Sequence, residues 1–118
     1  MKSGKSKQYD LEDRTFEFAK SVRVFLKVLP RNYINLEDAK QLVRSSGSIG
    51  ANYIEANEAL SRKDFVYRIK IARKEAKETI YWLNLIDINT VQKTERQSLS
   101  IEATELMKIL SAILKKSV

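Results

Sequence analysis

Residues 63–81 contain lysines and tyrosines at a spacing that suits contact with a polyanion. These side chains recur every three or four residues: Lys63, Tyr67, Lys70, Lys74, Lys77 and Tyr81. In an α-helix this spacing puts them on one side, which we call the basic stripe. Because ammonium groups contact phosphates and tyrosine rings stack on bases, the basic stripe predicts a surface that binds RNA or DNA. The alternative is an ordinary solvated helix face, in which the tyrosines cover the lysine stems.

A second set of residues in the same segment indicates protein contacts. This set, which we call the tryptophan stripe, comprises Arg68, Ile71, Glu75, Glu78 and Trp82. It lies outside the predicted core row, so its large apolar side chains would be exposed in a monomer, and tryptophan is enriched where proteins meet. The tryptophan stripe therefore predicts a subunit or partner interface. The alternative is that Trp82 packs under the second loop or the first helix of its own chain.

The chain lacks the residues on which most enzyme mechanisms depend. It contains no histidine and no cysteine, which removes the commonest general base and all thiolate chemistry. Three glutamate pairs have the i, i+3 spacing found in bundles that bind two iron ions: Glu55/Glu58, Glu75/Glu78 and Glu102/Glu105. Those iron sites also draw a histidine from each of two helices. We therefore expect no catalytic residue, no metal and no cofactor, and interpret the glutamates as surface charge.

Four amphipathic segments must position these side chains. Apolar residues at three- and four-residue spacing predict helices over residues 10–29, 35–60, 61–87 and 94–118. Their expected caps are Asp10, Asn35, Ser61 and Thr94, and Pro30 would end the first helix. Such segments pack most simply as an all-α, antiparallel up-down four-helix bundle. We expect this bundle to be one domain over residues 10–118, preceded by a flexible basic tail over residues 1–9 that contains Lys2, Lys5 and Lys7.

The helical repeat also predicts which residues face the core. The row expected for the second segment is Ala39, Leu42, Val43, Ser46, Ile49, Gly50, Tyr53, Asn57 and Leu60. The row expected for the third is Phe65, Ile69, Ala72, Ala76, Thr79, Ile80 and Leu83. In the fourth segment it is Leu99, Ala103, Leu106, Ile109, Leu110 and Ile113.

A run of small residues, 45–52, lies in the middle of the second segment. Glycine inside a helix costs about 0.5–1 kcal/mol relative to alanine, so its two glycines need a reason. Ser46 and Gly50 are four residues apart, as are Gly47 and Ala51. We interpret them as sites of close helix packing, where a neighbouring backbone or ring approaches. A phosphate-binding loop is the weaker alternative, because no strand precedes the run and the P-loop spacing is absent.

The formal net charge of +7 favours negatively charged partners. Nucleic acid, an anionic membrane surface or an acidic protein would all be attracted, although many soluble proteins are modestly basic for no particular reason. No stretch approaches the roughly 20 apolar residues of a membrane span, and the basic start leads into no hydrophobic segment. We therefore expect a cytoplasmic protein that does not enter the membrane.

Several segments resemble a known bacterial family. These are residues 10–19, the run SSGSIGANYIEANE over residues 45–58, Lys63-Asp64-Phe65, and ARKEAKETIYWL over residues 72–83. They resemble the four-helix-bundle proteins first named for intervening sequences in 23S ribosomal RNA genes. The resemblance covers nearly all of the chain after residue 9. The departures are mild: Gly47 stands where alanine is more usual, and Tyr53 where a smaller aliphatic residue often sits.

The resemblance implies a subunit that assembles into a ring-shaped homopentamer. It also implies kinship with the accessory protein of diversity-generating retroelements, a basic barrel that binds nucleic acid and a reverse transcriptase. Together with the basic stripe, it leads us to expect a non-catalytic oligomer that binds RNA or DNA. The alternative is a protein-interaction scaffold, or an accessory subunit for a partner enzyme such as a reverse transcriptase.

Overall fold

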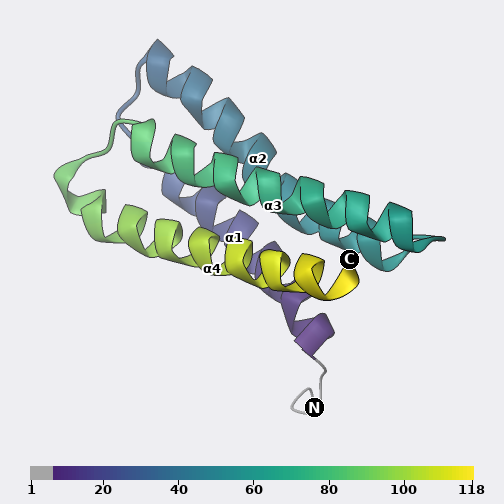
Figure 1. The fold of residues 1–118 in the computed structure, drawn as a ribbon. Helices are drawn as coiled ribbons and strands as arrows, with labels where there is room; N and C mark the ends of the chain where they lie inside the picture. Colours follow the sequence, from purple (N-terminus) through teal and green to yellow (C-terminus); the bar gives the residue numbers. More distant parts are fainter. Residues whose placement is uncertain (1–6) are drawn as a thin grey trace.

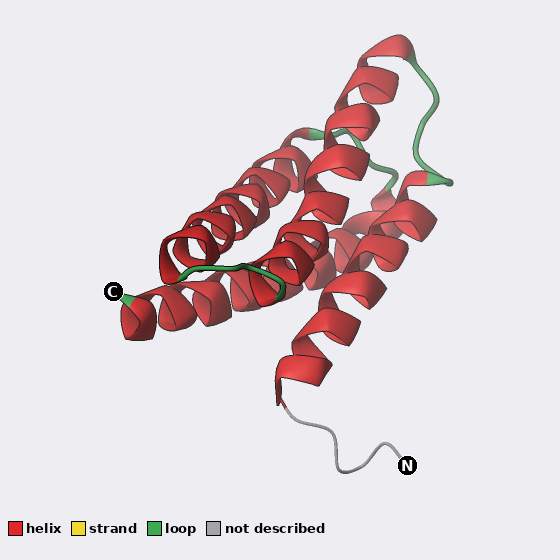
Figure 2. Ribbon diagram, turned by 90° about the vertical axis from the view of Figure 1, so that its right-hand side faces the viewer, coloured by secondary structure: helices red, strands yellow, loops and turns green. Residues whose placement is uncertain are grey.

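The described residues form four long α-helices and one short 3-10 helix. The computed structural model describes residues 7–118. Its elements are α1 (Lys7–Leu26), α2 (Tyr33–Asn57), α3 (Arg62–Leu85), the short 3-10 helix η2 (Thr90–Gln92) and α4 (Lys93–Ser117). Within residues 7–118 there is no strand, as Figure 2 shows.

The four helices form an antiparallel bundle. Consecutive helices lie side by side and run in opposite directions (Figure 1). α3 packs closely against both α2 and α4, whereas α1 packs against α2 and more loosely against α4. The predicted all-α four-helix bundle is thus confirmed. The arrangement leaves one side of α3 facing away from the other three helices.

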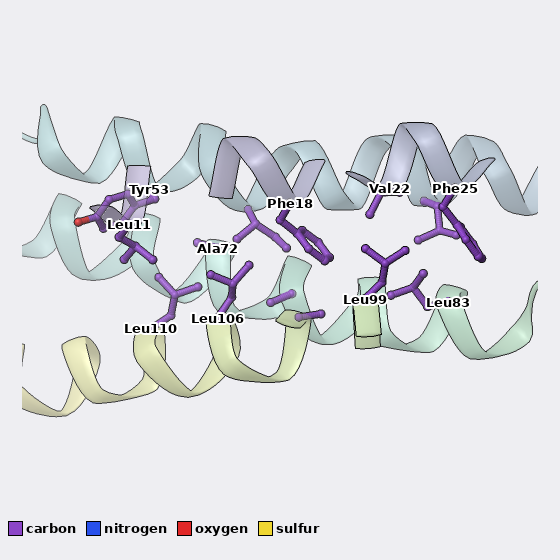
Figure 3. Packing of buried hydrophobic residues seen from close by; sticks show 14 of the residues in the cluster. Leu11, Phe18, Val22, Phe25, Tyr53, Ala72, Leu83, Leu99, Leu106 and Leu110 are labelled. Carbon is purple, nitrogen blue, oxygen red and sulfur yellow. The ribbon is translucent and has the colours of Figure 1, made fainter. Parts of the chain in front are cut away.

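The core runs along the inside of the bundle and takes residues from every helix. Phe25, Ile49, Leu83 and Leu106, one from each helix, have no exposed surface. Figure 3 shows aromatic and aliphatic side chains of α1 pointing toward leucines of α3 and α4. Burial of such side chains contributes about 1.5–3 kcal/mol each, so this apolar row is the main source of stability.

One of the predicted helix caps is confirmed. The side-chain oxygen of Ser61 accepts a hydrogen bond of 3.1 Å from the backbone N–H of Asp64, at the start of α3. This bond satisfies a backbone N–H that the first turn of the helix would otherwise leave without a partner.

The other predicted caps are wrong. α2 starts one turn early, at Tyr33, because Asn32 accepts the 2.8 Å bond from the backbone N–H of Asn35 and so takes the capping role. Thr94 lies inside α4, since η2 turns the chain before the helix begins. Asp10 lies inside α1, because no glycine or proline stops the helix from starting at Lys7. The tail lysines Lys2 and Lys5 lie outside the described residues.

Two members of the core row predicted for α2 are wrong. Leu60 is 97% exposed because α2 ends at Asn57 and the chain turns at the end of the bundle. Val43 is 37% exposed, since it lies at the edge of the buried side of α2. The inward rows of α3 and α4 are buried or partly buried throughout, as predicted. In the part of the chain that the structure describes, no helix has the length and apolarity needed to cross a membrane.

Candidate nucleic-acid interface

The basic stripe depends on α3 being continuous. The helix runs unbroken from Arg62 to Leu85, with the Ser61 cap at its start. Ile69, Ala72, Ala76 and Leu83 have no exposed surface and fix which side of α3 faces the core. The side chains on the opposite side therefore point into solvent along the whole helix.

All six residues of the basic stripe are exposed. Tyr67 is 58% exposed and Tyr81 is 59% exposed, so each has ring surface available to a ligand. Among the described residues, none of the lysines at positions 63, 70, 74 and 77 forms an ion pair. The ammonium groups are therefore available to an external anion.

The two carboxylates in the middle of α3, Glu75 and Glu78, form ion pairs with α2. Arg44 of α2 contacts both: its Nη1 lies 3.0 Å from a carboxylate oxygen of Glu75, and its Nη2 lies 2.6 Å from one of Glu78. Glu75 is buried, with 8% of its surface exposed. Arg44 holds both carboxylates, and Lys74 of the basic stripe lies close enough to Glu78 to help lower the pKa of its carboxyl group.

Glu78 is also fixed from its own helix. The indole N–H of Trp82 donates a 3.0 Å hydrogen bond to the same carboxylate oxygen that Arg44 contacts. The Trp82 hydrogen bond and then the Arg44 guanidinium lower the pKa of Glu78 below its ordinary value. Glu78 in turn raises the pKa of Arg44 through the same bond. The ion pair is therefore fully charged near neutral pH.

The tryptophan stripe lies against α2 of the same chain. Trp82 is partly buried and packs on the core, and Ile71 is also partly buried. Arg68 donates a 3.0 Å bond to Oδ1 of Asn52 in α2. The premise that these two apolar side chains would be fully exposed in a monomer is therefore wrong, since both are partly buried within one chain. Their role in a subunit interface stays a prediction.

The small-residue run packs against α1 at one position. A Cβ added to Gly50 would lie 2.8 Å from Oγ1 and 3.1 Å from Cβ of Thr15, which is closer than van der Waals contact allows. Ser46 is fully buried. A Cβ on Gly47 would meet only the end of the Arg23 side chain, at 3.6 Å, and Ala51 is exposed. Close approach thus involves the Ser46 and Gly50 side of the run.

Two features of the surface escaped the sequence patterns. A hollow of about 650 Å³ lies between the start of α3 and the end of α4, next to one end of the basic stripe. One flank of α2, at the edge of its buried side, also carries exposed apolar residues at two- and three-turn spacing: Leu36, Val43 and Ile54. The apolar residues on α2 could have been found from the helical repeat of the sequence. The hollow could not, because it depends on where two distant segments of the chain meet. Within the described residues, no group of three or more acidic side chains gathers as a metal site would require.

Comparison with known proteins identifies the family. The sequence model described as 23S rRNA-intervening sequence protein matches residues 7–112. The chain belongs to this family. A crystal structure of a family relative, a protein of unknown function from the S23 ribosomal protein family of Bacteroides thetaiotaomicron, superposes with a TM-score of 0.76. The two sequences are 35% identical, and the match covers 93% of this chain and 99% of the relative. No protein of curated function matches the chain.

Proposed function

We propose that this protein is a non-catalytic oligomer that binds RNA or DNA through the basic stripe of α3. The observation that carries the proposal is a row of exposed lysines, with no ion-pair partner among the described residues, interleaved with two exposed tyrosines. Phosphates bind such lysines by releasing counterions, and bases stack on such rings.

A charge-reversal experiment tests this proposal. Lys70, Lys74 and Lys77 are replaced together by glutamate, and binding of a labelled single-stranded RNA is measured at low salt. Each phosphate contact adds to affinity, so we expect the dissociation constant to rise at least about hundredfold. The result is compared with the control variant described next.

The control variant reverses Lys20 of α1, Lys27 of the turn after α1, and Lys40 of α2, all of which are exposed. It has the same net charge as the test variant but an intact basic stripe. We expect it to retain most of the affinity. If both variants lose RNA affinity equally, binding depends on net charge alone and not on the basic stripe. If the unaltered protein binds neither RNA nor DNA, the proposal is refuted.

We propose that the oligomer is a ring-shaped homopentamer, as the family resemblance implies. The exposed apolar residues Leu36, Val43 and Ile54 on α2 favour a protein contact there. The tryptophan stripe is the other candidate. Sedimentation velocity on Ile54→Arg and Ile71→Arg separates them: the variant that dissociates into monomers without losing helicity marks the interface, and a monomeric parent protein would refute assembly.

The same apolar side of α2 supports a second candidate function, a scaffold that binds a partner enzyme. Partner recovery from the native host, before and after nuclease treatment, distinguishes the two functions. A protein partner that is retained after nuclease treatment and lost in Ile54→Arg would favour the scaffold. Loss of every partner on nuclease treatment would favour nucleic-acid binding.

A further inference from the structure

The hollow at the end of the basic stripe combines an apolar lining with a cationic rim. Its lining residues are Arg62, Lys63, Val66, Tyr67, Lys70, Ser117 and Val118. Its volume of about 650 Å³ is within the range of pockets that hold small ligands. Figure 1 shows the last turn of α4 beside the first turns of α3, where the hollow lies.

The hollow is held in shape by a contact between the two helices. Arg62 donates a 3.1 Å hydrogen bond from Nη1 to the backbone carbonyl of Ser117, which joins the start of α3 to the end of α4. Val66 is partly buried between them. The two tyrosines of the basic stripe have different neighbours. Tyr67 lines the hollow and has the Arg68 guanidinium 6.0 Å from its ring centroid, whereas Tyr81 packs edge-on against Trp82, with ring centroids 5.1 Å apart.

The apolar and positively charged side chains of the hollow suit the base and the phosphates of a nucleotide. Lys63 and Lys70 are four and three residues from Tyr67, so their ammonium groups flank its ring on the same side of α3. A base needs an aromatic or apolar surface, and its phosphates need cations within reach. A fully paired base cannot enter such a hollow, because its neighbours in the duplex hold it in the stack.

We infer that this hollow accommodates one unpaired nucleobase of a single strand, with the base on Tyr67 and Val66 and the adjoining phosphates on Lys63 and Lys70. The inference rests on the proposed function and specifies its substrate as single-stranded nucleic acid. The remaining lysines of the basic stripe, Lys74 and Lys77, then continue along the same backbone. Duplexes contact only the lysines and bind more weakly.

Two tyrosines of nearly equal exposure provide a matched experiment. Binding of a labelled single-stranded 12-mer and of its duplex is measured for the unaltered protein, Tyr67→Ala, Tyr67→Phe and Tyr81→Ala. Loss of stacking on one base typically costs about 1–3 kcal/mol, which corresponds to a loss of affinity of about 5- to 150-fold. We expect this loss for the single strand in Tyr67→Ala, retention in Tyr67→Phe, and a smaller effect in Tyr81→Ala.

Mononucleotide competition identifies what the hollow recognises. Adenosine monophosphate should displace the single strand more effectively than inorganic phosphate, and it should lose this advantage in Tyr67→Ala. Equal affinity for single strand and duplex, or equal effects of Tyr67→Ala and Tyr81→Ala, would overturn the inference. If binding then still depended on Lys70, Lys74 and Lys77, the proposed function would stand without it.

Discussion

At the scale of single residues, the contact between Gly50 and Thr15 sets how closely α1 approaches α2. Thr15 is buried, and its hydroxyl donates a 2.9 Å bond to the carbonyl of Glu12, which fixes its position. Gly50→Ala would force the two helices apart or break this bond. We expect a loss of about 1–3 kcal/mol in the free energy of unfolding, measured by urea denaturation.

Gly47 provides the matched control for Gly50. It lies in the same helix three residues earlier, but a methyl group there meets only the end of Arg23 at ordinary distance. Gly47→Ala should therefore stabilise the protein by about 0.5–1 kcal/mol, because alanine loses less backbone entropy in a helix. If both substitutions stabilise the protein, the close contact with Thr15 is absent in solution.

The ion pair of Glu78 with Arg44 predicts a specific pH dependence. Because the pKa of Glu78 is lowered in the folded protein, the carboxylate contributes stability above its ordinary pKa. This contribution is lost as the pH falls through the lowered value. The unfolding free energy of the unaltered protein should therefore exceed that of Glu78→Gln at pH 7. The difference should begin to shrink near the ordinary pKa of 4.5 and vanish only below the lowered pKa of the folded protein.

Trp82 fluorescence reports on the same titration, because its indole N–H is bonded to Glu78. We expect the emission to change with a midpoint below the ordinary glutamate value, and Glu78→Gln to abolish the change. Glu37→Gln is the control: Glu37 pairs with Lys40 at the surface, with 69% of its side chain exposed. A pH-independent difference between the unaltered protein and Glu78→Gln would contradict the ion pair.

At the scale of the elements, Asn35 joins the two connections at one end of the bundle. Its side chain is buried, and its Nδ2 donates to the carbonyls of Pro30 and Asp87 at 3.0 and 2.9 Å. Its Oδ1 accepts from the Asp87 N–H at 3.1 Å. Asn35→Ala leaves these backbone groups without partners, so we expect a loss of about 2–3 kcal/mol in unfolding free energy.

Hydrogen exchange distinguishes this role from capping. The Asp87 amide should exchange faster in Asn35→Ala but not in Asn32→Ala, which removes only the α2 cap and should cost about 1 kcal/mol. If the two variants lose equal stability and leave the Asp87 amide protected, Asn35 does not join the two connections.

The same region shows how far the sequence predicts the elements. Periodicity predicted four helices and the inward rows of α3 and α4, because burial repeats along one helix. It could not predict that Asn35 would reach Asp87, 52 residues away, since that contact depends on where two loops meet. For the same reason the position of Trp82 on α3 was predictable, whereas its packing on the core was not.

At the scale of the whole molecule, the distribution of charge matters more than its total. The net charge of +7 attracts any polyanion. Arg44 pairs with both Glu75 and Glu78, whereas among the described residues no lysine of the basic stripe forms an ion pair. The net charge therefore attracts a polyanion from a distance, and the basic stripe is the face where we expect the polyanion to make contact. The lysines of α1 and α2 add to the attraction without adding contacts.

The salt dependence of nucleic-acid affinity distinguishes direct phosphate contacts from long-range attraction by the net charge. Each phosphate contact on a single strand changes the slope of log affinity against log salt by about 0.7. Neutral Lys70→Gln, Lys74→Gln and Lys77→Gln together should therefore flatten the slope by about 2, because three counterion-releasing contacts disappear. Fluorescence anisotropy between low and physiological salt measures this slope. As a control, replacing Lys20, Lys27 and Lys40 by glutamine should lower the affinity slightly and leave the salt slope nearly unchanged. If both sets of substitutions flatten the slope equally, nucleic acid does not bind along the basic stripe.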